Sequence, residues 1–187
     1  MKASLRFLLL ANYLNLLGFA MFSPLYALFA LRIGAQVFQT GAAWATYTAI
    51  AGLMIIIFGK MEDSFKKKYE LIVIGYFWLA AGALSFLLAK SPTSLFVVLG
   101  FNAIGAGILA PAWKAAYTHF HDRGKEASEW SFFDGGNMLI TAVAALAGGY
   151  IVKRYGFHAI FVSMFVIQVV AALVSIRLVG LMRKSSY

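Results

Sequence analysis

Cysteine is absent from this 187-residue chain, and charged residues make up only 12% of it. The lack of cysteine excludes thiol chemistry and cysteine ligation of a metal. Soluble globular domains carry about 25% charged residues. A chain with half that share and 62% hydrophobic residues has too few polar side chains to cover a surface in water. The scarcity of charge therefore excludes an ordinary soluble fold.

Catalytic motifs are also missing. No G-x-S-x-G, H-E-x-x-H or P-loop pattern occurs, and no glycine fingerprint opens a βα unit. The sequence also lacks the Ser/His pair of a rhomboid-like protease, the two N-P-A turns of a water channel and the long cytoplasmic extensions of an ABC-type transporter. We therefore predict a protein that is not an enzyme and that has neither a cofactor nor a metal site.

Apolar residues recur in runs of about 20, enough to cross a ~30 Å hydrocarbon core as a helix rising ~1.5 Å per residue. Helices are required because lipid satisfies no backbone hydrogen bond. The sequence predicts an all-α membrane protein in which residues 1–187 form one transmembrane domain. The six predicted helices are 6–31, 40–60, 70–90, 95–118, 130–152 and 157–180.

Basic residues outnumber acidic ones by 16 to 7, which gives a net charge of +9. They lie between the apolar runs rather than on a soluble basic patch, which argues against nucleic acid as a partner. The predicted helices place twelve of them on the side of the termini and four on the other side, Arg32, Lys90, Lys153 and Arg154. Short cytoplasmic loops retain Lys and Arg, so both termini are predicted to lie in the cytoplasm, with the chain in the plasma (inner) membrane.

The stretch "GKMEDSFKKKYE" places seven charged residues in the turn between the second and third predicted helices. Gly59, Asp63, Lys67 and Lys68 follow the spacing G-x-x-x-D-x-x-G-[RK]-[RK], with Lys66 in place of the second glycine. This spacing resembles the loop-2/3 signature of the major facilitator superfamily. In that family the aspartate of the loop meets a helix end of the other half, so the resemblance implies that these four residues form a gating latch.

Three further segments are similar to the same family. "LGFAMFSPLYALFAL" resembles its first helix, "GAGILAPAWKAAYTHF" the end of its fourth, and "AALAGGYIVKRYGFHAIF" its fifth helix, outer turn and the start of its sixth. Family members usually have twelve helices in two halves. The resemblance therefore implies a half-size unit most like the N-terminal half.

Matching offsets indicate an internal repeat. Pro24 lies 18 residues into the first predicted helix and Pro111 lies 16 into the fourth. Gly59 follows Pro24 by 35 residues, and Gly149 follows Pro111 by 38. Each glycine precedes a basic turn, and the two turns lie on opposite faces of the membrane. The pattern predicts that helices 1–3 and 4–6 form a 3+3 inverted repeat.

Polar and aromatic residues align along three predicted helices and are our candidates for a substrate cavity: Asn12, Asn15, Phe19, Phe22 and Tyr26 on the first, Asn102 on the fourth, and Asp134, Asn137 and Thr141 on the fifth. Two interpretations remain open for the amides, since a buried amide can line a cavity or simply bond a neighbouring helix.

Asp134 stands out because a carboxylate inside a span is costly unless it is paired, protonated or facing water. Lys114, near the end of the fourth predicted helix, is expected at similar depth. Three roles are open: a structural ion pair between Lys114 and Asp134, a carboxylate that takes up a proton during transport, and a contact with substrate. Lys114 can also extend to the cytoplasmic water.

These features predict half of a secondary active transporter that moves a small solute by alternating access. A single half would leave its polar stripes facing lipid, so a parallel homodimer is expected, with the bilayer, a second copy and the solute as partners. Two alternatives stay open: a membrane scaffold or assembly subunit that does not transport, and a half-transporter that needs a different partner chain.

Overall fold

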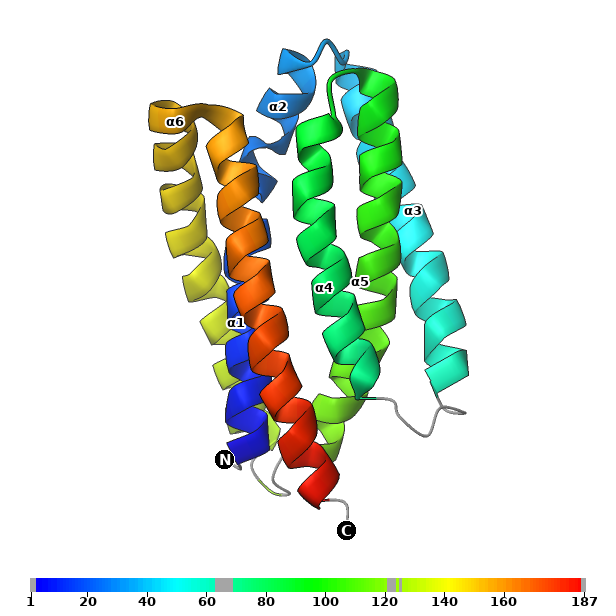
Figure 1. The fold of residues 1–187 in the computed structure, drawn as a ribbon, viewed down its shortest axis with the longest axis vertical. Helices are drawn as coiled ribbons and strands as arrows, with labels where there is room; N and C mark the ends of the chain where they lie inside the picture. The colour runs from blue at the N-terminus through cyan, green and yellow to red at the C-terminus, as the bar shows by residue number, and fades with distance from the viewer. Residues whose placement is uncertain (1–2, 63–68, 121–123, 125, 186–187) are drawn as a thin grey trace.

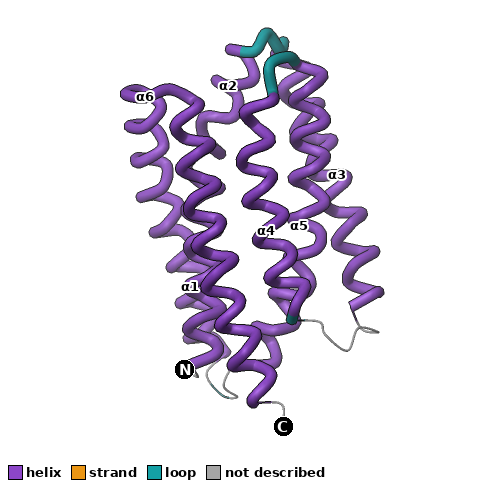
Figure 2. The backbone as a smooth tube through the Cα atoms, viewed as in Figure 1, coloured by secondary structure: helices purple, strands orange, loops and turns teal. Residues whose placement is uncertain are grey.

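The computed structural model describes residues 3–62, 69–120, 124 and 126–185. Figure 2 shows helices joined by short connections, with no strand in the described part of the chain. The elements are α1 (Ala3–Phe22), the 3-10 turn η1 (Ser23–Leu25), α2 (Tyr26–Arg32), α3 (Val37–Glu62), α4 (Glu70–Ser85), the 3-10 turn η2 (Phe86–Leu88), α5 (Pro92–Phe120) and α6 (Glu126–Ser185). The all-α prediction is confirmed.

Five helical stretches in the described residues are long and apolar enough to cross a membrane, where the sequence predicted six separate helices. The difference lies in α6, which continues through the turn expected between 152 and 157. At Gly156 the backbone has φ 80° and ψ 179°, a conformation open to glycine, so one residue redirects the chain without a loop. Figure 1 shows α6 folding back at this point. We call residues 126–155 the first arm and 157–185 the second arm. The five stretches are Leu5–Arg32, Val37–Met61, Glu70–Leu88, Pro92–His119 and Glu126–Gly180.

The helices pack around α1 and α5. α1 contacts α6, α3 contacts α5, and α4 contacts both α5 and α6. Only 6% of the span in α3 is buried, against 50% of the span in α5. α3 therefore lies at the edge of the bundle, with one side on α5 and the other side uncovered. Figure 1 shows both termini at the same end of the bundle.

Two glycines lie at close contacts between helices. A side-chain carbon at Gly148 would meet the backbone carbonyl of Met21, which shows that the first arm of α6 lies directly against α1. A side-chain carbon at Gly107 would likewise meet Met54, where α3 lies against α5. Glycine allows such close approach between membrane helices.

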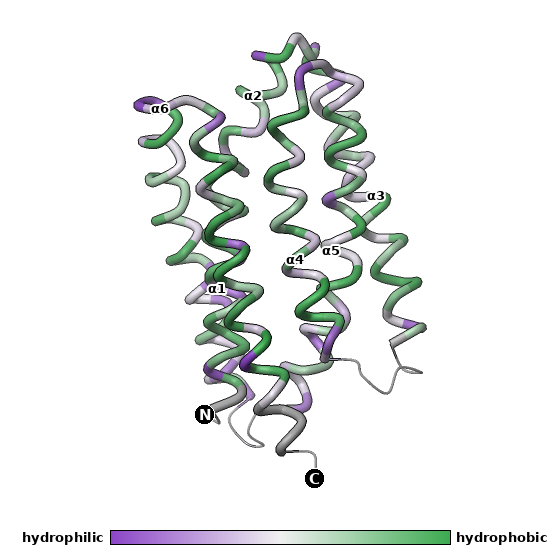
Figure 3. The backbone as a smooth tube through the Cα atoms, in the orientation of Figure 1, coloured by the Kyte–Doolittle hydropathy of each residue, from purple (hydrophilic) through white to green (hydrophobic). Residues whose placement is uncertain are grey.

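Two buried clusters fill the bundle. The cluster far from the termini is aromatic: Phe22 is 3% exposed, with the ring centroids of Phe29, Phe86 and Phe161 at 5.7, 4.9 and 5.2 Å. Edge-to-face rings at these distances stabilise a core beyond their buried area. The second cluster, which includes Leu5, lies nearer the termini. Figure 3 shows hydrophobic residues along the helices and hydrophilic ones mostly toward the helix ends.

Candidate functional site

A cavity of about 330 Å³ lies between α1 and α5, and side chains from α3, α4, η2 and both arms of α6 complete its wall. None of the described acidic residues lines it, and no group of His, Asp or Glu in the described chain could hold a metal ion. Its polar lining is Asn12, Asn15, Asn102, Lys114 and Gln168. Its aromatic lining is Phe19, Tyr47, Phe86, Trp113, Trp130 and Phe133.

Three polar atoms on this wall have no hydrogen-bond partner among the described residues: Asn15 Oδ1, Trp113 Nε1 and Gln168 Oε1. Gln168 and Trp113 are only 3% and 6% exposed. A buried polar group without a partner costs about 1–3 kcal/mol, and native proteins rarely keep one unless something else completes the bond. The residues of the cavity wall thus bring one buried donor and two buried acceptors that have no partner among the described residues.

The other two amides on the wall are paired. Asn12 Nδ2 donates to Asn137 Oδ1 at 2.9 Å and joins α1 to the first arm of α6. Asn102 Nδ2 donates to the carbonyls of Val98, at 2.8 Å, and Gly82, at 3.2 Å, and so joins α5 to α4. Asn12 and Asn102 thus line the cavity and also bond neighbouring helices, whereas Asn15 and Gln168 retain acceptors with no partner in the described part of the chain.

The bond between Asn12 and Asn137 gives a prediction on stability. In a double-mutant cycle with Asn12→Leu and Asn137→Leu, we expect a coupling energy of about 0.6 kcal/mol and at most about 1.7 kcal/mol, the range for hydrogen bonds between membrane helices. The measurement is the free energy of unfolding in detergent micelles. Additive effects of the two substitutions would show that the bond contributes nothing to stability.

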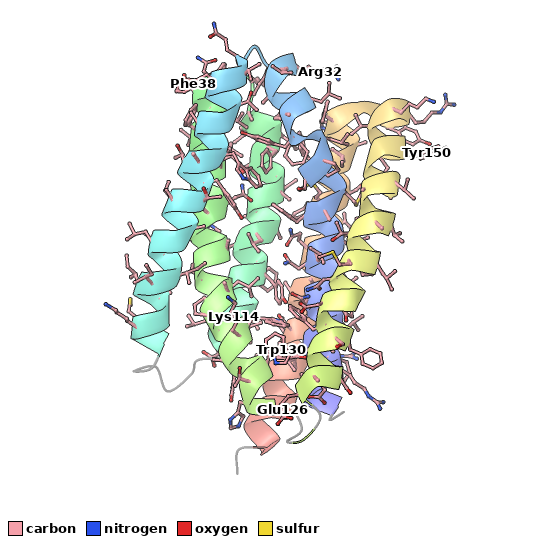
Figure 4. The ribbon with its side chains drawn as sticks, turned by 180° about the vertical axis from the view of Figure 1, so that it is seen from behind. Arg32, Phe38, Lys114, Glu126, Trp130 and Tyr150 are labelled. Carbon is pink, nitrogen blue, oxygen red and sulfur yellow. The ribbon has the colours of Figure 1, made fainter. Side chains whose placement is uncertain are left out.

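Aromatic rings close the cavity toward the termini. Trp113 stacks on Phe133 at 4.8 Å and on Tyr117 at 5.1 Å between ring centroids, and Trp130 lies 4.7 Å from Tyr117. The Tyr117 hydroxyl also donates to the Glu129 carbonyl at 2.8 Å, which fastens α5 to the start of α6. Figure 4 labels Lys114 and Trp130 at this end, on the face between α3 and the first arm of α6.

The structure separates the predicted cavity residues on α1 and α2 into two groups. Asn12, Asn15 and Phe19 line the cavity, as does Asn102 on α5. Phe22 and Tyr26 do not line this cavity: Phe22 belongs to the aromatic core, and the Tyr26 hydroxyl donates to the Thr40 carbonyl at 3.0 Å. Both line a much smaller pocket that shares Phe19 and Asn102 with the cavity.

A local change of helix geometry separates Tyr26 from the cavity residues of α1. The 3-10 turn η1, which contains Pro24, has a different number of residues per turn from α1. It interrupts the regular repeat before Tyr26, whereas Phe22 is the last residue of α1 and lies before the turn.

Asp134 and Thr141 do not line the cavity, and both side chains are exposed on the first arm of α6. The described residues show no ion pair between Asp134 and Lys114, so the structure gives no support to their predicted pairing. Lys114 instead contributes the only charged side chain that the described residues bring to the cavity. Its neighbours Trp130 and Phe133 were not among the sequence candidates, because nothing in the sequence of this helix start indicates that it lies at a cavity.

The predicted latch is only partly within the described residues. Gly59 lies near the end of α3, where a side-chain carbon would come within 3.8 Å of the Pro111 Cβ, an ordinary contact with α5. Asp63, Lys67 and Lys68 lie outside the described residues. The structure therefore places one of the four latch residues beside α5 and leaves the other three to experiment.

Comparison with known proteins identifies the family. The family model of the Major Facilitator Superfamily matches residues 8–186. The chain belongs to the major facilitator superfamily. Among solved structures it is similar to the POT family transporter PepTSo, known from an in meso crystal structure, with a TM-score of 0.75 and 15% sequence identity. The match covers 98% of this chain and 38% of the PepTSo chain. No curated protein sequence matches the chain.

Membership of the facilitator family confirms the predicted resemblance and identifies a multi-pass membrane protein of a transporter family. The likeness to PepTSo, at 15% identity, concerns the fold. This facilitator chain spans well under half the length of that transporter. Membership of the family points to transport rather than catalysis.

Proposed function

We propose that this facilitator unit carries a small solute across the plasma membrane by secondary active transport, with both termini in the cytoplasm. The observation that carries the proposal is the cavity of about 330 Å³ whose wall holds three polar atoms without a partner among the described residues. Amides would orient the polar groups of the solute, and the aromatic rings would cover its apolar surface. The solute would change sides as two six-helix units rock about it, which is alternating access.

Six membrane crossings in a 3+3 inverted repeat are part of this proposal. The two arms of α6 hold 30 and 29 residues, each enough for a span, and they run in opposite directions in Figure 1. In such a repeat span 1 (α1) corresponds to span 4 (α5), and span 2 (α3) corresponds to span 5 (the first arm of α6). A contact between α1 and the first arm should therefore have a counterpart between α5 and α3. Both contacts are present, which supports the repeat.

A second six-helix unit would cover the face that carries Asp134. Asp134 and Thr141 are exposed on the first arm of α6, eight and fifteen residues from its start, with Met138 between them. These spacings put the three side chains on one helix face. A carboxylate facing hydrocarbon is costly, so such residues face protein or water. We propose that a second copy of the chain, in parallel orientation, covers this face.

Single cysteines test the second copy, since the chain has no cysteine of its own. Met138→Cys is expected to form a disulfide between two chains in native membranes, because Met138 would face the partner. The matched control is Leu173→Cys on the second arm, which is also exposed but would face lipid. Equal crosslinking at both sites, or none at Met138, would contradict the proposed interface.

Transport itself is tested in liposomes that contain only this chain. Neutral and singly charged solutes are first screened for thermal stabilisation of the protein, and each stabilising solute is then assayed for saturable uptake. We expect Ala106→Phe, which fills the cavity, to abolish uptake, and Ala81→Phe, which is exposed and outside the cavity, to retain it. Absence of uptake for every solute in dimeric protein would favour the scaffold alternative.

We further propose that Gly59, Asp63, Lys67 and Lys68 form a latch on the cytoplasmic side. The Asp63 carboxylate would meet the start of α6 in the second copy, where a helix N-terminus stabilises a negative charge by roughly 0.3–1 kcal/mol. Lys67 and Lys68 would contact anionic headgroups. Cysteines at Asp63 and at residues 127–131 should crosslink between chains, and crosslinks formed only within one chain would show that the latch is absent.

Lys114 and Asp134 are proposed to act separately in this structure. Lys114 faces the cavity and can contact a solute, whereas Asp134 faces the proposed second copy and can take up a proton as that interface opens. If Asp134 couples protons to transport, Asp134→Asn will abolish uptake driven by a pH gradient and spare exchange at equal pH. Continued accumulation against a gradient would exclude that role.

A further inference from the structure

A second pocket lies at the end of the bundle opposite the termini, away from the solute cavity. It measures about 540 Å³ and is bounded by the end of α2, by η2 and the connection after it, and by the bend of α6. Three side chains that can carry positive charge line it, namely Arg32, Lys90 and His158, and no acidic side chain of the described residues does. The pocket is therefore an open hollow whose charged side chains, all exposed, are of one sign.

The lack of acidic residues holds for this whole end of the described molecule. All seven Asp and Glu residues fall between positions 62 and 70 or between 122 and 134. The described ones belong to helix segments that begin or end toward the termini (Figure 1). The cations of the pocket thus have no carboxylate nearby in the described chain to neutralise them, and an anion from outside can do so.

The floor of the pocket is apolar. Phe29, Phe86 and Phe161 are 5%, 5% and 2% exposed, and they form its floor. The Arg32 guanidinium lies over the Phe157 ring at 5.6 Å from the centroid, an arrangement that holds the cation at the rim. Figure 4 shows Arg32 labelled at this end of the bundle. The second arm of α6 also begins here, and the N-terminus of a helix adds partial positive charge.

The depth of the pocket matches that of a lipid headgroup. Arg32 is the last residue of one candidate span, and Lys90 lies two residues beyond the end of another, which finishes at Leu88. Positive side chains at this level meet phosphate groups, whereas the aromatic floor beside them suits the start of an acyl chain. A freely dissolved phosphate would use the cations and leave the apolar floor without a role.

From these observations we infer that the pocket binds the phosphate headgroup of an anionic phospholipid, with Arg32 and Lys90 as the principal contacts and His158 beside them. Charge-assisted hydrogen bonds from Arg and Lys to phosphate oxygens are short and strong. The inference goes beyond the transport proposal, since the site is separate from the solute cavity and can be tested without any transported solute.

Native mass spectrometry of the detergent-purified full chain, titrated with phosphatidylglycerol or phosphatidylcholine, tests the site. We expect phosphatidylglycerol to bind on the order of tenfold more tightly than phosphatidylcholine. Arg32→Gln with Lys90→Gln should remove this preference. The matched control is Lys153→Gln with Arg154→Gln, which removes the same charge from the same end but outside the pocket, and it should retain the preference.

Four results would overturn the inference. If the control variant with Lys153→Gln and Arg154→Gln loses the preference for phosphatidylglycerol equally, the preference comes from general surface charge. If the wild-type chain shows no preference, an anionic lipid is excluded. Displacement of phosphatidylglycerol by millimolar inorganic phosphate would identify a site for free phosphate instead. If the double variant does not fold, Lys90→Gln alone replaces it, because the contact with the Phe157 ring is made by Arg32 and is kept in that variant. An unchanged preference for phosphatidylglycerol in Lys90→Gln would also count against the site.

Discussion

Gly148→Ala is expected to lower the free energy of unfolding by about 1–3 kcal/mol, the usual cost of adding a methyl group to a packed core. The added carbon would collide with the backbone carbonyl of Met21, and a backbone atom cannot move aside as a flexible side chain can. Because the contact joins α1 to the first arm of α6, relief requires separating two helices along their length. A denaturant titration in detergent micelles measures the effect.

The neighbouring glycine provides the control. A side-chain carbon added at Gly149 would have no neighbouring atom of the described residues within 4 Å, so Gly149→Ala meets open space. Alanine is favoured over glycine inside a helix by up to about 1 kcal/mol, and both variants gain this contribution. Gly149→Ala should therefore be neutral or slightly stabilising. Equal loss of stability in the two variants would show that the close contact between α1 and α6 is absent in the membrane protein.

The membrane spans were predictable because each is a long run of apolar residues, and many residues of the run indicate the same structure. Runs of about 20 apolar residues at the first four predicted helices correspond to α1 with α2, and to α3, α4 and α5. A helix satisfies the backbone hydrogen bonds of such a run in lipid, whereas an open strand cannot. The turn in "YIVKRYGF" was also visible in the sequence. Its form was not, because a single residue, Gly156, redirects the chain and leaves no loop to recognise.

The site was less predictable because it depends on which way each helix turns. A regular helical repeat placed Phe22 and Tyr26 on the same stripe as Asn15. Phe22, the last residue of α1, packs in the aromatic core, and Tyr26 follows the 3-10 turn η1, which interrupts the repeat. The sequence also could not show that Asn12 and Asn137 would bond each other. Periodicity identifies residues that share a face, whereas their partners depend on contacts between distant segments.

Gln168→Leu is expected to weaken solute binding without lowering the stability of the protein. Leucine keeps a similar volume and removes an oxygen that is buried with no hydrogen-bond partner among the described residues. Because an unpaired buried polar group costs about 1–3 kcal/mol, its loss should leave the thermal midpoint unchanged or raise it. A bound solute that donates to this oxygen would lose its partner, so its affinity should fall about tenfold, or about 1.4 kcal/mol.

Asn102→Leu is the matched contrast on the same cavity wall. Asn102 Nδ2 donates to the carbonyls of Gly82 and Val98, so its removal leaves the Gly82 carbonyl of α4 without this bond and should lower the thermal midpoint. Thermal midpoints with and without the stabilising solute measure both effects in one assay. A fall in the Gln168→Leu midpoint as large as that of Asn102→Leu would mean that the Gln168 amide bonds the protein itself. The solute would then have to be held by Asn15 and Trp113, the other groups on the wall that have no partner among the described residues.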